Sequence, residues 1–351
     1  MNPSIKQKDR IISIDIIRGL ALFGILLINV KAFQVFTDDV QLPDYNGLNG
    51  MIESLIQIFI EKKFFSIFSF LFGVGFYIFA SRAENRGDKP RWRFARRLLA
   101  LLLIGIIHIL FFWGSILAPY AVIGFFLIPF YRAKVSTISK WLGGIITVFI
   151  ITQLLGIFSP DMVVFSNVIS YLSLRIDTIT IFIMFLSGLL AAKANWIRKI
   201  NDLSTQIRRL QIITFPLFIG FSIWIWFASQ SNDPHIQEII ALGTIPTTYL
   251  YLSSLFVILE NKRIAKLLQP IARVGQMAFT NYLAQSFIGL AIISIMDIEV
   301  VSPINAVIIS IIIFTIQIIY SVIWFKFFKM GPFEKVWRFM TYGRNAASIR
   351  K

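Results

Sequence analysis

The stretch RRLLALLLIGIIHILFFWGSILAPYAVIGFFLIPFYR, from Arg96 to Arg132, places a long apolar run between two basic flanks. The run from Leu98 to Tyr131 exceeds the ~20 residues that cross a bilayer as one helix. Gly114 and Pro119 interrupt it, and both residue types are common in turns. The pattern therefore predicts an antiparallel hairpin of two spans. One long tilted helix followed by a re-entrant piece is the alternative.

The rest of the chain has the same apolar character. Apolar residues make up 57% of the sequence and the mean hydropathy is +0.75, whereas a soluble domain is about 45–50% apolar. The sequence predicts an all-α fold, a polytopic transmembrane helix bundle of about ten spans. We expect these spans at residues 14–32, 64–80, 98–115, 117–131, 141–158, 176–192, 211–228, 239–259, 275–296 and 305–328.

Positive charge gives the spans a direction. If Met1 lies in the cytoplasm, all but four of the 34 Lys and Arg residues fall on the cytoplasmic side, the exceptions being Lys31, Lys62, Lys63 and Arg175. Lys and Arg in short loops resist translocation, which is the positive-inside rule. We therefore expect a multi-pass membrane protein with both termini in the cytoplasm.

Composition argues against several classes of partner and cofactor. The net charge of +16 would suit nucleic-acid binding, but the basic residues are dispersed among short loops, so we expect membrane lipids and no nucleic acid as partners. The absence of cysteine excludes disulfides, thiolate catalysis and iron–sulfur clusters. With two histidines in the whole sequence, we expect no metal site.

The chain divides into two membrane halves. Residues 1–192 form an N-terminal half with the candidate catalytic core, and residues 211–351 form a C-terminal half with a basic cytoplasmic tail. Residues 193–210 are polar and basic and are expected to connect the halves in the cytoplasm. Within the first half, apolar residues between Met51 and Ile60 recur at helical spacing beside polar residues between Asn49 and Glu61, which predicts an amphipathic helix on the outer surface.

Polar groups inside the predicted spans are the candidate functional residues, because each costs about 2.5 to 3.5 kcal/mol in hydrocarbon if charged. Asp15, Arg18 and Asn29 share one face of the first span and form either a structural ion pair with an interhelical amide or one wall of a polar cavity. Arg97 and His108 repeat the eleven-residue spacing in the third span, with the imidazole about 16 Å deeper. His108 is either an interhelical hydrogen-bonding residue or a general base.

The ninth span carries the densest polar cluster. Five polar side chains lie between Thr280 and Ser286, and Asn281 and Gln285 are one helical turn apart. Such a cluster either lines a substrate path or joins two helices in a hydrogen-bonded seam, and the sequence favours neither. In the second span, Gly73 and Gly75 predict a surface on which helices pack closely.

Five sequence blocks then resemble a known family. RIISIDIIRGLALFGILLINV (Arg10–Val30), KFFSIFSFLFGVGF (Lys63–Phe76), RRLLALLLIGIIH (Arg96–His108), VGQMAFTNYLAQS (Val274–Ser286) and GPFEKVWRFMTYG (Gly331–Gly343) resemble, in order, the YeiB-like family of bacterial inner-membrane proteins. The resemblance implies a multi-pass protein of the bacterial plasma (inner) membrane. The C-terminal half of that family is a domain of unknown function.

A more distant resemblance suggests an activity. The family is similar to transmembrane acyltransferases of the acyltransferase-3 and heparan glucosaminide N-acetyltransferase types, which move an acyl group from cytosolic acyl-CoA to an acceptor across the membrane with an embedded histidine. The acyltransferase-3 pattern is a basic residue, ten residues and a histidine on the first span. Here the first span has Arg18 and Asn29, and the third span has Arg97 and His108 at that spacing.

The first hypothesis is therefore a membrane-embedded acyltransferase with acyl-CoA or acetyl-CoA as donor. His108 is assigned as general base or acyl carrier, and Asn29 with Asn281 or Gln285 as the groups that orient it or bind the oxyanion. At the inner mouth, the CoA phosphates are assigned to Arg18, Arg96 and Arg97. The acceptor is an unidentified hydroxyl or amine, and the sequence permits a homodimer.

Two other classes remain open from the sequence. The same polar faces suit a transporter or flippase for a small metabolite or lipid-linked substrate, which predicts transport without a covalent product. A non-enzymatic scaffold is favoured if the polar seams are packed and dry.

Overall fold

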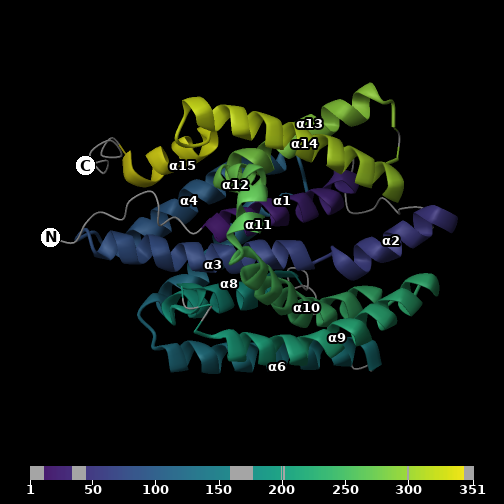
Figure 1. Cartoon of the computed structure of the whole chain (residues 1–351), viewed down its shortest axis with the longest axis horizontal. Helices are drawn as coiled ribbons and strands as arrows, with labels where there is room; N and C mark the ends of the chain where they lie inside the picture. The colour runs from purple at the N-terminus through teal and green to yellow at the C-terminus, as the bar shows by residue number, and fades with distance from the viewer. Residues whose placement is uncertain are drawn as a thin grey trace.

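Helices of similar direction lie side by side along the long axis of the molecule (Figure 1). The computed structural model describes residues 12–33, 45–158, 177–198, 200, 202–298 and 300–343. Within these residues all regular structure is helical. The longer elements are α1 (Ile12–Ala32), α2 (Gly47–Phe59), α3 (Lys63–Glu84), α4 (Pro90–Ile109), α5 (Leu117–Leu127), α6 (Val135–Phe158), α8 (Asp177–Lys193), α9 (Ser204–Gln230), α10 (Ile236–Leu259), α12 (Gln269–Gln276), α13 (Ala278–Ile295), α14 (Pro303–Phe327) and α15 (Pro332–Tyr342); short helices are η2 (Ile128–Tyr131), η4 (Trp196–Arg198) and α11 (Lys262–Leu267).

Each predicted span contains or overlaps one of these long helices. Among the described residues, seven segments are long and apolar enough to cross a membrane: Ile12–Ala32, Gly47–Glu84, Val135–Phe158, Ser204–Gln230, Ile236–Leu259, Ala278–Ile295 and Pro303–Phe327. The helices α4, α5 and α8 are outside this set. The first turns of α4 carry four arginines, and α5 and α8 have 11 and 17 residues. The all-helical prediction is confirmed for this part of the chain.

The apolar run that follows Arg97 folds as two helices. The helix α4 ends at Ile109, and α5 begins at Leu117 after a turn. The two helices pack closely at Gly105, where a Cβ would lie 2.6 Å from the backbone nitrogen of Ala118. Pro119 sits in the first turn of α5, where its missing N–H leaves no helical hydrogen bond unmade. The hairpin, and not one long helix, is therefore the structure of this stretch.

Glycines bring the centre of the bundle together. A Cβ on Gly188 of α8 would lie 1.9 Å from the carbonyl oxygen of Phe70, and one on Gly73 of α3 would lie 2.1 Å from that of Phe185. The two backbones touch reciprocally, as small residues allow between membrane helices. The prediction of close packing is confirmed for Gly73, whereas a Cβ on Gly75 would meet open space.

The predicted ninth span, 275–296, is broken near its start. The helix α12 ends at Gln276, and its Gly275 packs so tightly on α1 that a Cβ would lie 1.9 Å from the Asp15 carbonyl oxygen. The helix α13 then begins a new direction, and the Glu334 carboxylate from α15 accepts hydrogen bonds from the backbone N–H groups of Phe279 (2.8 Å) and Thr280 (3.2 Å). A carboxylate at a helix N-terminus satisfies free donors and the helix dipole.

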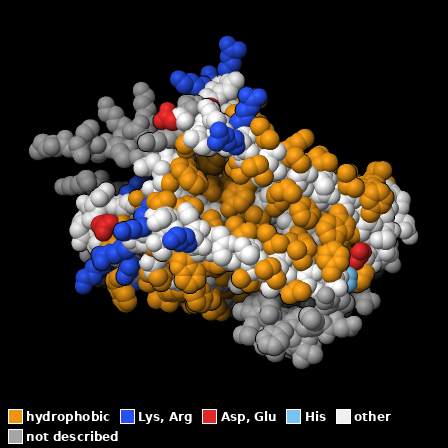
Figure 2. Space-filling model, turned by 90° about the horizontal axis from the view of Figure 1, so that it is seen from below, with side chains coloured by type: hydrophobic (Ala, Val, Ile, Leu, Met, Phe, Trp, Pro, Cys, Tyr) orange, Lys and Arg blue, Asp and Glu red, His pale blue; other side chains and the backbone are white. Residues whose placement is uncertain are grey.

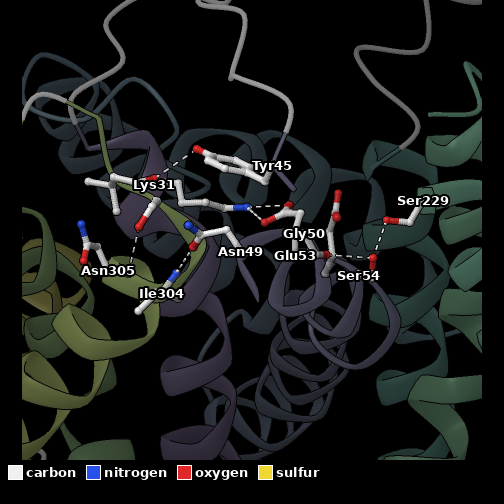
Figure 3. Close-up of polar contacts among 12 residues, drawn as sticks. Lys31, Tyr45, Asn49, Gly50, Glu53, Ser54, Ser229, Ile304 and Asn305 are labelled. Carbon is white, nitrogen blue, oxygen red and sulfur yellow. Dashed lines mark hydrogen bonds and ion pairs between the residues drawn. The ribbon is translucent and has the colours of Figure 1, made fainter. Parts of the chain in front are cut away.

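One end of the bundle is organised around α2, and we call it the α2 end (Figure 3). Lys31 at the end of α1 pairs with Glu53 of α2 at 2.7 Å. On its two sides, α2 also contacts α14 and α9: the Asn49 Oδ1 accepts the backbone N–H of Ile304 at 3.2 Å, and the hydroxyl oxygens of Ser54 and Ser229 are 2.7 Å apart. The predicted amphipathic helix is confirmed as a helix and is fixed to three others.

Tyr45 completes this layer. Its hydroxyl donates to the carbonyl oxygen of Val301 at 3.5 Å. Burial, together with the nearby Glu53 carboxylate, raises the pKa of Tyr45 above its ordinary value.

The opposite end of the bundle is covered by α15, and we call it the α15 end. Arg86 donates to the Tyr342 hydroxyl at 3.4 Å, and Lys193 donates to the carbonyl oxygen of Tyr131 at 2.6 Å. Tyr131 in turn donates to the Glu84 carboxylate. The loops predicted to be cytoplasmic therefore contact one another here.

Helices of the two predicted halves share their interfaces. The first-half helices α1, α3 and α4 pack against α12, α10 and α15 of the second half. The division into halves 1–192 and 211–351 stays a prediction, and the packing joins them into one bundle. Of the predicted connector, residues 196–198 form η4 and α9 begins at Ser204.

The surface has an apolar face with basic groups gathered on part of its border (Figure 2). Exposed apolar side chains of α6 and α9, which lie at the bottom of Figure 1, include Val148, Ile212, Phe215 and Phe227. In Figure 2 the Lys and Arg side chains collect at the left and top, while hydrophobic side chains spread over the middle. An apolar surface of this extent suits contact with lipid tails.

Candidate functional site

His108 lies in the last turn of α4 and is nearly closed off from solvent, at 2% exposed. Its two ring nitrogens have hydroxyl partners from different parts of the chain. The Nδ1 atom is 2.8 Å from the Oγ of Ser115, and Nε2 is 2.9 Å from the Oγ of Ser286. Ser115 lies in the turn between α4 and α5, which brings its side chain back to the imidazole. Ser286 lies in the polar segment of α13.

The hydrogen-bond network assigns the histidine tautomer. The Ser286 hydroxyl donates its one proton to the carbonyl oxygen of Leu283 at 3.0 Å, so its oxygen accepts a proton from Nε2. Nδ1 is then the acceptor for the hydroxyl proton of Ser115. A neutral imidazole in this arrangement is placed to remove the proton from Ser115, as a general base does for a serine nucleophile.

Two further polar groups surround Ser115. The Tyr282 hydroxyl accepts the backbone N–H of Ile116 at 3.1 Å, and it also has hydrogen-bonding contacts with the side chains of Ser115 and Asn29. The rings of Tyr282 and His108 are 5.6 Å apart. Asn29 of α1 contacts the cluster through the Tyr282 hydroxyl, and its predicted role at the imidazole or the oxyanion stays a prediction.

The cluster borders a large cavity of about 2120 Å³. Its walls come from α1, α3, α5, α6 and α8, and most of them are apolar. Asn29, Ser115 and Tyr282 line it, and His108 lies behind Ser115. The arrangement presents a hydroxyl, backed by a base, to a space that a substrate can enter.

Asn281 and Gln285 lie in a packed seam between α13 and α14. The Asn281 amide donates to the carbonyl oxygen of Val274 (2.9 Å) and to Ser321 (3.2 Å), and Gln317 donates to the Asn281 backbone oxygen at 2.9 Å. Gln285 donates to Gln317 at 3.3 Å. Both side chains are buried, and their contacts are those of a hydrogen-bonded seam between two helices, which is one of the two alternatives for this cluster. Their predicted role at the imidazole stays a prediction.

The three arginines assigned to a CoA phosphate lie toward the α15 end and are engaged with the protein. Arg18 pairs with Asp15 at 3.1 Å, which confirms that ion pair, and Arg96 donates to the carbonyl oxygen of Met340 at 3.3 Å. The Arg97 guanidinium lies 3.7 Å from the centre of the Trp337 ring and 4.9 Å from that of Phe79.

These positions separate the arginines from the cavity. Among the described residues, the basic ones that line it are Lys62 and Lys140, and the three arginines are not part of the lining. A CoA phosphate that bound Arg97 would have to replace or share its aromatic contacts.

Ser115 is the site residue that sequence reasoning missed. It follows His108 by seven residues, but it lies in a turn, where helical periodicity gives no direction for a side chain. A serine beside a predicted turn, within one loop of a buried histidine, is the signal that would have drawn attention to it.

Comparisons with known proteins agree on a family and give no activity. A family model described as "Protein of unknown function (DUF418)" matches residues 191–344. An uncharacterized 39.9 kDa protein of Bacillus acidopullulyticus is 30% identical over 368 residues, covering 100% of this chain and 99% of the relative. YxaH of Bacillus subtilis is 28% identical, covering 95% and 94%, and YeiB of Escherichia coli is 24% identical, covering 98% and 99%. No solved structure matches the chain.

Proposed function

Since this chain belongs to the YeiB-like family of bacterial proteins, we propose its function from its own site: acyl transfer inside the membrane, from acyl-CoA to a hydroxyl or amine. The observation that carries the proposal is the hydrogen-bonded series Ser115–His108–Ser286, with Ser115 on the wall of a cavity.

Two chemical steps follow from this geometry. In the first, Nδ1 of His108 takes the Ser115 proton while Oγ bonds to the acyl carbon; the carbon–sulfur bond breaks, and the CoA thiol leaves with the proton. In the second, the acceptor gives its proton to Nδ1 and bonds to the acyl carbon, and Ser115 leaves and regains a proton. Asn29 and the Tyr282 hydroxyl are donors for the oxyanion, a role typically worth about 2.7 to 4 kcal/mol for one donor.

The proposed topology has ten spans in the bacterial inner membrane, with both termini and the α15 end in the cytoplasm. The charge bias supports it, because the arginine-rich start of α4 is at the α15 end. Contacts support it as well: Arg86 with Tyr342 at one end, and Lys31 with Glu53 at the other, each join segments predicted on the same side.

The topology has a direct test because the sequence contains no cysteine. A single cysteine at Ser231, in the exposed α9–α10 turn, should react with a membrane-impermeant maleimide on intact cells. A single cysteine at Asn85, in the exposed α3–α4 turn, should react only after the membrane is opened. Equal labelling of both on intact cells would contradict the proposed orientation.

The activity is tested with purified protein in liposomes and a radiolabelled acyl-CoA. The wild-type chain should hydrolyse or transfer the acyl group and form an acyl ester that mass spectrometry locates on Ser115. Ser115→Ala and His108→Gln should lose at least about a hundredfold of the rate. Ser187→Ala is the matched control, because Ser187 also pairs with a tyrosine, Tyr249, at 2.6 Å but lies in α8 outside the cluster. Full transfer by Ser115→Ala would remove the proposal.

A transporter or flippase is the second candidate, and the size of the cavity favours it. It predicts movement of a substrate across a proteoliposome membrane with no new covalent product. In that case Ser115→Ala would keep its transport rate.

A further inference from the structure

The cavity is too large for a small metabolite alone. Its volume of about 2120 Å³ is roughly twice the upper end of the ~300–1,000 Å³ range of small-molecule sites. An acetyl group or a single sugar would leave most of its wall uncovered. The occupant that the cavity fits must therefore cover a long apolar surface.

The cavity extends along most of the segment that α5 and η2 form. On one side its lining extends from Ala118 in α5 to Phe130 in η2, a rise of about 19 Å. This length exceeds half of the ~30 Å hydrocarbon core, which is about 15 Å. A single acyl chain of a membrane lipid has room to lie along this wall.

The cavity opens sideways toward the surrounding bilayer. Its lining residues Val122 and Phe126 of α5 are 47% and 63% exposed, and Val148 of α6 is 59% exposed. Apolar side chains that both line a cavity and face outward form the border of a lateral opening. A lipid can enter there without its chains crossing water.

Most of the charged groups of the lining lie at the α2 end of the cavity, whereas Lys140 lies apart from them in the second turn of α6. Lys62 and Asp177 form an ion pair at 3.2 Å, and Glu61 accepts a hydrogen bond from Gln237 at 3.1 Å; all four residues line the cavity. Ser115 faces the same space. A polar end, with a mainly apolar wall leading away from it, fits an amphiphile whose headgroup lies at the α2 end.

We propose that this cavity is the binding site of a glycerophospholipid that enters between α5 and α6, and that this lipid is the acceptor in acyl transfer. Its chain lies along α5, and its headgroup reaches the Lys62–Asp177 pair. The role as acceptor rests on the proposed function, whereas the occupancy does not. In the transfer, the headgroup hydroxyl or amine gives its proton to His108 and bonds to the acyl carbon as the Ser115 ester bond breaks.

Two adjacent glycines of α6 provide a matched pair of variants. A Cβ on Gly144 or on Gly143 would meet no atom within 4 Å, so both positions accept a side chain without moving the backbone. Gly144 lines the cavity, whereas Gly143 is exposed on α6 and lies outside the lining. Gly144→Phe therefore places an aromatic ring inside the cavity, and Gly143→Phe adds the same ring elsewhere on the helix.

The experiment uses full-length protein in vesicles of phosphatidylethanolamine and phosphatidylglycerol that contain a phospholipid with a diazirine in its acyl chain. After illumination, wild-type protein should carry crosslinks at α5 and α6 residues of the cavity. Gly144→Phe should lose at least about tenfold of this labelling, and Gly143→Phe should keep it. Equal labelling of the two variants, or crosslinks only on other surfaces, would overturn the proposal.

A Ser115→Ala variant and a photoreactive acyl-CoA separate this proposal from the proposed activity. Ser115→Ala should keep the crosslinks and lose transfer. If it keeps both, the lipid site stands and the proposed function fails. If a photoreactive acyl-CoA labels the cavity and the phospholipid does not, the cavity holds the donor and the lipid proposal is wrong.

Discussion

Replacing Gly188 by alanine tests the α3–α8 interface, on which the centre of the bundle depends. The added Cβ would lie 1.9 Å from the Phe70 carbonyl oxygen, with the Phe70 carbonyl carbon at 2.8 Å and the Val74 nitrogen at 3.0 Å. Ordinary contact begins near 3.4 Å, so α3 and α8 must separate by about 1.5 Å. All three atoms belong to a helix backbone, which cannot rotate away as a flexible side chain does.

The separation would disturb side-chain contacts on both helices. Phe72 and Phe185 stack with their ring centres 4.5 Å apart, and Ser69 shares a 2.6 Å hydrogen bond with Tyr120 across the same region. Overpacking of a filled core typically costs about 1 to 3 kcal/mol. We expect Gly188→Ala to lie at the upper end of that range because backbone atoms are the obstacle.

The assay compares thermal unfolding of two purified variants in the same detergent. Gly75→Ala is the control, because it makes the same substitution in α3 where the new Cβ meets open space. We expect Gly75→Ala to keep or slightly raise the unfolding temperature, since alanine favours helix by up to about 1 kcal/mol over glycine. Gly188→Ala should unfold several degrees lower. If the two variants unfold at the same temperature, the helices do not touch as described.

Other predictions concern single contacts. Ser286→Ala leaves Nε2 of His108 without its acceptor, and the loss of about 1 to 3 kcal/mol from a buried unpaired group should slow transfer about 5- to 150-fold and shift the ¹⁵N resonances of the ring; an unchanged rate and spectrum would contradict the tautomer assignment. Glu334→Gln removes the charge that faces the α13 N-terminus and should lower stability by about 0.3 to 1 kcal/mol, less than Glu334→Ala; a Glu334→Gln protein that unfolds at the wild-type temperature would show that the charge is unimportant. Lys31→Met and Glu53→Gln should be non-additive in a double-mutant cycle of unfolding free energies, since their ion pair is half-buried; simple additivity would mean that the pair contributes nothing.

The helices were predictable from sequence because hydrocarbon imposes length and composition on any segment that crosses it. The expected span 64–80 corresponds to α3, Lys63–Glu84, and the hairpin around Gly114 is two helices. The break before α13 was not predictable, because Gly275 and Glu334 act there through contacts with distant parts of the chain.

The site was predictable only in part. Periodicity placed His108 inside a span and Asn29 on a polar face, and both belong to the cluster around Tyr282. It also placed Asn281 and Gln285 on one face, but helical spacing does not tell which neighbour a face meets, and here the neighbour is α14. Arg97 looked available for phosphate because nothing in its local sequence reveals that Trp337 covers it.

The short α5 segment has a consequence for the membrane around it. The helix α5 has 11 residues and η2 has 4. Together they rise by about 24 Å, which is less than the ~30 Å thickness of an average hydrocarbon core. If α5 and η2 form one of the proposed spans, a bilayer that meets this segment must become thinner there, at a cost that grows with its own thickness. Short-chain lipids should therefore collect beside α5, at the entrance between α5 and α6, and the thickness of the host membrane becomes a physical control on what the protein can admit.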